Sequence, residues 1–388
     1  MDARRTRRSL PCSLALAGAV LALSGAAAEP TPEARLHAAT SKAYRAAGQA
    51  APALDPALSR AASALASRAR KDGMAAATSG EAVAREVSLA GGWDPIPRVV
   101  AARSPAAGRA LQAIEARTDL ASLPATRVGV AYVPGDPEVA LLLLADRRAL
   151  LNPFPRQVST GASFELSGHL VFPLYDGQVV VAGPRGVARP EPRNAGEERN
   201  AFSARVSFPE AGEYTVEVVA QSVKGPEVAA LLRVQAGRAA AGEPSKAAAE
   251  PAESADLAKA EAQVLAAINA RRKAAGLRSL ARSATLDGVA ADHSQEMAKL
   301  DYFAHVSPVG GDLTQRLGKA GFAFRNAAEN LGEAATALDA HRGIEASPGH
   351  LANLLDPRLD LVGLGTARVK RGQIDNVLLT EVFAHAAP

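Results

Sequence analysis

Hydrophobic and polar positions change their period along the chain, and these changes divide it into regions. In residues 31–150, the apolar positions between residues 54 and 65 recur with a helical period. Residues 127–146 instead hold two apolar runs on either side of a Pro-Gly-Asp-Pro turn, a pattern that predicts two strands. We therefore expect residues 31–150 to form an α+β domain.

Residues 155–237 follow the period of strands. Tyr214, Val216 and Val218 alternate with polar neighbours, and turns that contain Gly and Pro separate the short apolar runs. This pattern predicts a small β-sandwich, and the run that begins at Phe208 resembles the penultimate hairpin of bacterial Ig-like domains. Residues 238–256 are rich in Ala, Gly, Pro, Glu and Ser without a period, which predicts a flexible linker.

Residues 257–388 combine both periods and are predicted to form a further domain. Apolar positions indicate helices from Leu257 to Gly276 and over residues 286–300, 313–319 and 334–345. Ser347 followed by Pro348 is typical of an N-cap with Pro at the first helical position, so a short fifth helix should follow. Residues 361–369 and 376–384 predict the two strands of a hairpin.

The first 28 residues are predicted to lie outside the fold. Four Arg residues precede a short apolar run from Ser13 to Leu23, and three Ala residues follow, as in a secretory signal peptide. This run is shorter than the about 20 residues that a spanning helix needs. We expect no transmembrane segment in the mature chain, and a secreted, periplasmic or cell-envelope location.

Charge and cysteine content exclude some classes of partner. The formal net charge of the chain is +4, and the first 28 residues hold four Arg and one Asp, so the remainder has a net charge of +1. No Lys/Arg cluster indicates nucleic acid. The one cysteine, Cys12, lies in the predicted signal peptide. The mature domains would therefore be held by packing without disulfides.

Seven short motifs follow one another in the last third of the chain. They are Tyr302–Pro308, Gly321-Phe322, Ala328–Leu331, Ser347–His350, Ala352–Leu355, Val362–Gly365 and Thr380–Phe383. This ordered set resembles the CAP superfamily (cysteine-rich secretory, antigen 5, pathogenesis-related-one) over residues 257–385, especially its bacterial SCP-like branch. The resemblance implies a three-layer α-β-α sandwich.

The resemblance also implies that His305, Glu329 and His350 point into one central cleft. Two imidazoles and a carboxylate can hold a divalent metal or share protons near neutral pH, so His305 and His350 are candidate ligands for Zn²⁺. Each residue taken singly has a structural explanation, such as a helix cap or a surface position. The ordered set of motifs favours the cleft.

The fourth member of the family's tetrad has no assignment from the sequence. Animal and plant members place a second Glu three residues after a Trp. Here Ile344 takes the Trp position and Ser347 falls where that Glu would stand. Glu381, on the last predicted strand, is a candidate to face the cleft. His293 lies on the apolar face of its helix, which predicts a hydrogen-bonded core histidine.

Two interpretations of residues 31–150 stay open. Residues 54–62 resemble residues 284–291, and the two predicted strands of residues 127–146 resemble those that begin at Val362. The region is then a degenerate CAP-like domain without counterparts of His305, Glu329 and His350. The alternative is an unrelated α+β domain, because short apolar patterns recur by chance. A different strand order would exclude the first interpretation.

Three functions are compatible with these patterns. The first is a secreted binding module whose cleft holds a cell-envelope component, a lipid or a protein. The second is a metal-dependent hydrolase, a peptidase or a wall-cleaving enzyme, with the two histidines on the metal and Glu329 as general base. The third is a structural or adhesive envelope protein. No nucleophile motif such as Gly-x-Ser-x-Gly is present, which favours binding over catalysis.

Overall fold

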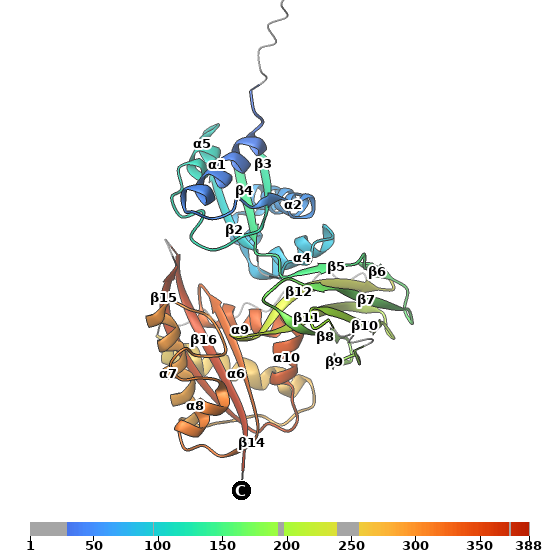
Figure 1. Ribbon diagram of the computed structural model, residues 1–388, viewed down its shortest axis with the longest axis vertical. Coiled ribbons are helices and arrows are strands. Elements are labelled where there is room, and N and C mark those ends of the chain that lie inside the picture. The colour runs from blue at the N-terminus through green and yellow to red at the C-terminus, as the bar shows by residue number, and fades with distance from the viewer. Residues whose placement is uncertain (1–28, 96, 193–197, 239–255, 372–373, 388) are drawn as a thin grey trace, which may run out of the picture. The chain divides into compact units, whose positions relative to one another are not determined.

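The protein is a mixed α+β structure in which two helix-containing regions are separated along the chain by a region of strands (Figure 1). A computed structural model describes residues 29–95, 97–192, 198–238, 256–371 and 374–387. The predicted signal peptide, residues 1–28, and nearly all of the predicted linker, residues 238–256, lie outside the described residues. Within the described ranges, no helix is long and apolar enough to cross a membrane.

The last third of the chain is built on a four-stranded sheet of order β13-β15-β16-β14. Strands β13 and β15 run parallel, and the other two pairs are antiparallel. The elements are α6 (Leu257–Ala274), β13 (Ala281–Arg282), α7 (Ala284–Leu300), α8 (Leu313–Lys319), β14 (Phe324–Ala334), α9 (Ala337–Ala346), α10 (Pro348–Leu354), β15 (Leu361–Arg371) and β16 (Ile374–Ala386). The helices and the hairpin confirm the sequence patterns, whereas strand β14 was not predicted.

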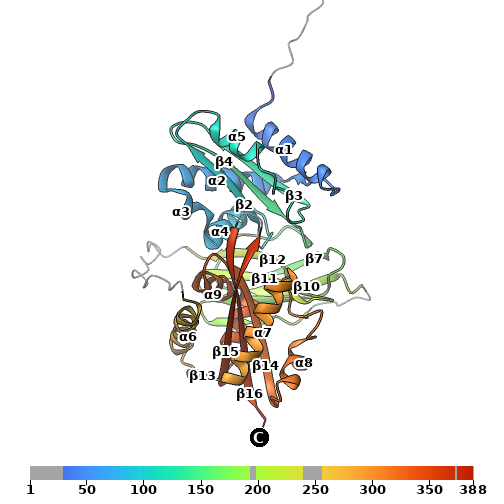
Figure 2. The same ribbon diagram turned by 90° about the vertical axis from the view of Figure 1, so that its left-hand side faces the viewer.

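Alternating side chains of β16 give this sheet two apolar faces. Val377, Leu379 and Phe383 pack with α6, α9 and α10, whereas Val382 and Ala384 pack with α7 and α8. Successive side chains of a strand point to opposite faces, so each face meets its own helices. Figure 2 shows α6 and α9 on one side of the sheet and α7 and α8 on the other. Strand β14 is left at one edge.

The middle segment consists of two sheets that share one core. The elements are β5 (Ala149–Leu151), β6 (Gln157–Val158), β7 (Ser163–Leu170), β8 (Tyr175–Gly183), β9 (Gly186–Ala188), β10 (Ala201–Ser207), β11 (Gly212–Ser222) and β12 (Gly225–Ala236). One sheet has the order β10-β7-β5 and the other β6-β12-β11-β8-β9. Leu166 and Phe202 of the first sheet pack with Val216 and Leu232 of the second. Strand β5 starts before residue 155, where the sequence placed the start of the sandwich.

The N-terminal segment carries a four-stranded sheet of order β1-β3-β4-β2, covered by five helices. The elements are α1 (Pro32–Ala46), β1 (Ala53–Leu54), α2 (Pro56–Asp72), α3 (Met74–Thr78), α4 (Gly80–Leu89), β2 (Arg98–Ser104), α5 (Arg109–Glu115), β3 (Arg127–Val133) and β4 (Glu138–Ala145). Strands β1 and β3 are parallel, and β4 pairs antiparallel with β3 and β2. When the strands of each sheet are numbered in chain order, this sheet has the same strand order and the same strand directions as the C-terminal sheet.

The two four-stranded sheets also share a close contact between a glycine and a helix. A Cβ atom added to Gly129 on β3 would lie 2.3 Å from the carbonyl carbon of Leu58 on α2. A Cβ added to Gly363 on β15 would lie 2.1 Å from the carbonyl carbon of Leu286 on α7. In both places the helix backbone rests directly on the strand, which only glycine allows.

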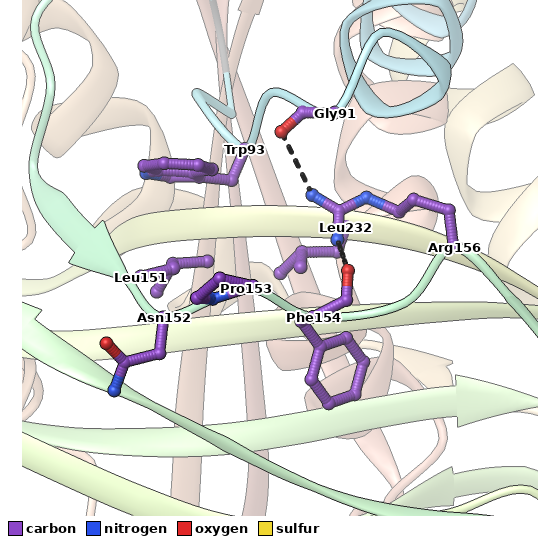
Figure 3. Close-up of a pocket in the computed structure, with 8 residues that line it drawn as sticks. All are labelled: Gly91, Trp93, Leu151, Asn152, Pro153, Phe154, Arg156 and Leu232. Carbon is purple, nitrogen blue, oxygen red and sulfur yellow. Dashed lines mark hydrogen bonds between the residues drawn. The ribbon is translucent and has the colours of Figure 1, made fainter.

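The N-terminal and middle segments meet around Arg156. Its guanidinium donates to the carbonyl oxygens of Phe154 at 2.8 Å, Gly92 at 2.9 Å and Gly91 at 3.4 Å. Burial lowers the pKa of Arg156 to about 10. Figure 3 shows this group beside a hollow of about 170 Å³ that Trp93 and Leu232 also line. None of the residues that line the hollow is a candidate site residue.

Candidate functional site

Glu329 is the centre of a buried polar cluster at the β14 edge of the C-terminal sheet. Its side chain is 3% exposed. His305 Nδ1 donates to Glu329 Oε1 at 2.9 Å. Arg316, on α8, donates to Oε2 at 2.8 Å and to Oε1 at 3.0 Å, so its guanidinium binds the carboxylate in a bidentate manner. We call His305, Arg316, Glu329 and His350 the His–Glu cluster.

The two predicted histidines lie side by side. The ring centroids of His305 and His350 are 6.5 Å apart. The two residues come from different sides of the sheet edge, because His305 follows α7 and His350 lies in the first turn of α10. His350 Nδ1 is buried and has no hydrogen-bond partner among the described residues. The structure therefore brings His305, Glu329 and His350 together, and of the two histidines it is His305 that bonds to the Glu329 carboxylate.

Charges and burial set the protonation of the cluster. Burial by itself would raise the pKa of Glu329, but the hydrogen bonds from His305 and Arg316 hold this pKa below its usual value. Burial, with a smaller contribution from nearby His305, lowers the pKa of His350 to about 3. At neutral pH, Glu329 is thus an ionised carboxylate paired with Arg316, and His350 is a neutral imidazole.

Glu381 lies next to the cluster but does not face its rings. It is fully buried and accepts a hydrogen bond from His341 Nδ1 at 2.7 Å and from Asn330 Nδ2 at 3.1 Å. Asn330 also donates to the backbone oxygen of His350 at 3.2 Å. Neighbouring positions of β14 point to opposite faces, so Glu329 joins the α8 side and Asn330 the α9 side. Among the described residues, Asn330 therefore links Glu381 to the backbone of His350.

The remaining candidates have structural roles. His293 Nε2 donates to the backbone oxygen of Ala304 at 3.0 Å within the core, as its apolar helix face predicted. Ser347 caps α10, where its Oγ accepts from the backbone amide of His350 at 3.4 Å. Ser347 Oγ also donates to Glu217 Oε1 at 2.7 Å. Glu217 comes from strand β11, 130 residues earlier.

Sequence reasoning missed Arg316, Asn330 and Glu217 as members of this neighbourhood. Arg316 sits on a short helix outside all seven motifs, and Glu217 belongs to another segment. Asn330 follows Glu329 directly within one of the motifs. The alternation of side chains along a strand could have placed it on the face opposite Glu329, had β14 been predicted.

The cluster does not offer a complete set of metal ligands. A structural or catalytic zinc site needs three or four protein donors. Both oxygens of Glu329 already accept from Arg316, and His305 Nδ1 is bonded to Glu329. Over the residues that the structure describes, no group of three or more His, Cys, Asp or Glu side chains could hold a metal ion. The residues present therefore do not fit Zn²⁺.

Comparison with known proteins assigns the last third of the chain to a family. Residues 265–383 match the family model "CAP: Cysteine-rich secretory protein family". The uncharacterised protein YkwD of Bacillus subtilis (strain 168) is 31% identical over 106 residues, which are 27% of this chain and 41% of YkwD. The chain thus spans about two fifths of that relative. The C-terminal third is a CAP domain, as its motifs predicted.

Solved structures with similarity to the chain include two bacterial proteins. An outer surface protein from Borrelia burgdorferi is 20% identical, with a TM-score of 0.31, over 34% of this chain and 96% of that chain. An extracellular protein with an SCP domain from Bacillus anthracis str. Ames is also 20% identical, with a TM-score of 0.29, over 50% of this chain and 67% of that chain.

Proposed function

We propose that the protein is an exported ligand-binding protein whose CAP domain binds a cell-envelope component at the His–Glu cluster. One observation carries this proposal, namely the bidentate hold of Arg316 on Glu329. A carboxylate with a lowered pKa and both oxygens occupied is a poor general base near neutral pH. The cluster is better suited to present fixed polar groups to a ligand than to move protons.

The proposal includes the finer architecture that the sequence indicated. Residues 257–388 would be a three-layer CAP sandwich, residues 155–237 with β5 an Ig-like spacer, and residues 1–28 a signal peptide that is removed on export to the cell surface, the periplasm or the medium. Helices on both faces of the C-terminal sheet and the shared core of the two middle sheets support these assignments.

We further propose that residues 31–150 are a degenerate CAP-like repeat. The matching strand order and the matching glycines support this interpretation, because Gly129 pairs with Leu143 as Gly363 pairs with Val382. The same register sets Val99 at the position of Glu329. In the helices, counting from Leu58 and Leu286 sets Leu65 at the position of His293.

This register also explains why the repeat would be inert. Val100 takes the position of Asn330, and Leu142 takes that of Glu381. Every polar position of the network that can be matched in this way is apolar in the N-terminal segment. That segment would therefore act as a scaffold, and ligand binding would belong to the C-terminal domain alone.

Co-sedimentation with insoluble peptidoglycan sacculi tests the proposed function. We expect the purified protein to bind sacculi, and His350→Ala to weaken this binding while the matched variant His169→Ala, on an exposed position of β7, leaves it unchanged. Vesicles of phosphatidylglycerol and phosphatidylcholine distinguish a lipid from a wall ligand. Release of soluble wall fragments that stops in chelator would support the hydrolase instead. Absence of binding to both probes would contradict the proposal.

A further inference from the structure

The β11–β12 hairpin of the middle segment lies against the His–Glu cluster. The backbone amide of Val306 donates to the backbone oxygen of Lys224, in the turn between β11 and β12, at 2.9 Å. The next residue, Gly225, is so close that an added Cβ would lie 2.7 Å from His305 Cβ. This turn therefore occupies the space beside His305 down to van der Waals contact.

The same strand also contacts the start of α10, the helix that carries His350. Glu217 on β11 is fully buried, and it accepts from Ser347 Oγ and from the backbone amide of Gly349, both at 2.7 Å. A Cβ added to Gly349 would lie 3.2 Å from Val219 Cγ2, two residues further along β11. Strand β11 and its turn thus follow the cluster from the start of α10, beside His350, to the segment that holds His305.

The turn covers part of His305, and both histidines are partly buried. The His305 side chain is 17% exposed, and His350 Nδ1 is buried without a partner among the described residues. A buried imidazole nitrogen without a partner has lost its hydrogen bond to water, which costs free energy. A state in which this nitrogen forms a hydrogen bond is therefore favoured. A ligand that bonds this nitrogen would provide one, but it must first pass the hairpin.

We propose that the β11–β12 hairpin is an intramolecular cover of the His–Glu cluster, and that the ligand binds when this hairpin moves away. The proposal rests on the function proposed above, since it concerns access to the same cluster. It gives the middle segment a regulatory role rather than that of a spacer. The hairpin would move together with the sheet that carries it, because β11 pairs with β8 as well as with β12.

Two full-length variants, which act on different contacts of the hairpin, test whether it covers the His–Glu cluster. Gly225→Ala would push the turn away from His305, and its matched control is Gly186→Ala. Both glycines have a positive φ, +100° and +108°, so backbone strain is similar, but a Cβ on Gly186 meets nothing within 4 Å. Glu217→Gln instead weakens the contact of the middle of β11 with Ser347 and Gly349, away from the turn beside His305.

Two readouts need no ligand. Hydrogen exchange reports opening at the Val306 amide, and the rate of diethyl pyrocarbonate modification reports access to His305 and His350, with exposed His169 as internal reference. We expect Gly225→Ala and Glu217→Gln both to speed exchange at Val306 and modification of both histidines several-fold, and Gly186→Ala to change neither. Because Glu217 lies far along the strand, its effect at Val306 distinguishes hairpin movement from a local clash.

Binding to sacculi then separates the two proposals. Faster exchange in both variants with tighter sacculi binding supports the cover and the function together. Faster exchange without binding by any variant supports the cover and contradicts the proposed function. Unchanged exchange at Val306 in Glu217→Gln overturns the cover, whatever the binding result, and it does so even if Gly225→Ala fails to fold by circular dichroism.

Discussion

At the residue scale, the feature that decides the chemistry of the site is the pair between Arg316 and Glu329. Both side chains are buried, at 8% and 3% exposure. Removing one partner of such a pair leaves an uncompensated charge in the interior, which is far worse than having no pair at all. This pair converts a potential general base into a fixed structural anion that orients His305.

We predict that Arg316→Met lowers the free energy of unfolding by about 3–5 kcal/mol, because Glu329 is left buried and unpaired. Urea unfolding followed by circular dichroism measures the change. The control is Arg342→Met, which removes an exposed pair with Asp339 and should cost about 0.2–1 kcal/mol. The double variant Arg316→Met/Glu329→Gln should recover part of the loss. Equal effects of the two single variants would contradict the prediction.

The sequence predicted the N-cap of α10. Ser347 caps this helix because a short polar side chain before a helix can satisfy a free backbone amide. His305, Glu329 and His350 came from ordered motifs. Arg316 and Glu217 could not be found in this way, because nothing local requires them. Each acts on a partner brought near only by the folded chain.

At the element scale, each four-stranded sheet has a strand glycine on which a helix backbone rests directly. We predict that Gly363→Ala destabilises the protein by about 1–3 kcal/mol or more, since the new methyl group overlaps the backbone of α7. Gly129→Ala should do the same through α2. Thermal unfolding measures both changes, and similar losses would agree with a repeated architecture.

The control for these variants lies in α7 itself. A Cβ on Gly288 meets nothing within 4 Å, so Gly288→Ala should stabilise the helix by up to about 1 kcal/mol. A Gly363→Ala variant as stable as Gly288→Ala would contradict the close packing of β15 on α7.

The contact between β11 and α10 should respond to pH through Glu217. Burial raises the pKa of this carboxyl to about 7, against the hydrogen bonds from Ser347 and Gly349 and the charge of Arg189. The folded protein therefore holds this proton more tightly than the unfolded chain does. Its stabilising effect is complete below the usual pKa of 4.5 and is lost as the pH rises through about 7.

We predict that wild type loses stability relative to Glu217→Gln between about pH 4.5 and about pH 8, because Gln has no proton to release. Urea unfolding of both proteins at several pH values in this window gives the difference in their free energies of unfolding. The contributions of all other titrating groups cancel in this difference. A difference that stays flat would show that the pKa of Glu217 is the same in the folded and unfolded chains, and a gain of wild type over the variant would show that folding lowers this pKa.

Elements with strong periods were predicted from the sequence, whereas strand β14, which lacks such a period, was not. The hairpin of β15 and β16 and the helices α7 and α10 have clear apolar spacing and caps. Strand β14, Phe324–Ala334, mixes Arg, Asn, Glu and Gly with apolar residues, because Glu329 and Asn330 on its two faces form polar contacts. A functional edge strand therefore looks like a loop in the sequence.

At the scale of the whole molecule, Arg156 joins the N-terminal segment to the middle one through backbone carbonyls on both sides. We predict that Arg156→Lys splits thermal unfolding into two transitions, because an ammonium group cannot reproduce the guanidinium fork. Differential scanning calorimetry checks this. Arg185→Lys, whose side chain is 73% exposed in its pair with Glu210, is the control and should leave the profile unchanged. An unaltered profile in Arg156→Lys would mean that other contacts suffice.

The pairing of charges inside the CAP domain has a consequence for how fast a ligand is captured. Glu329 faces Arg316, Glu381 faces His341, and His350 is neutral, so little electric field leaves the site. Long-range attraction of an ion depends on unbalanced charge and fades as salt is added. The association rate constant at this site should therefore be nearly the same at low and at high salt concentration. Recognition would then depend on short-range contacts formed after the encounter.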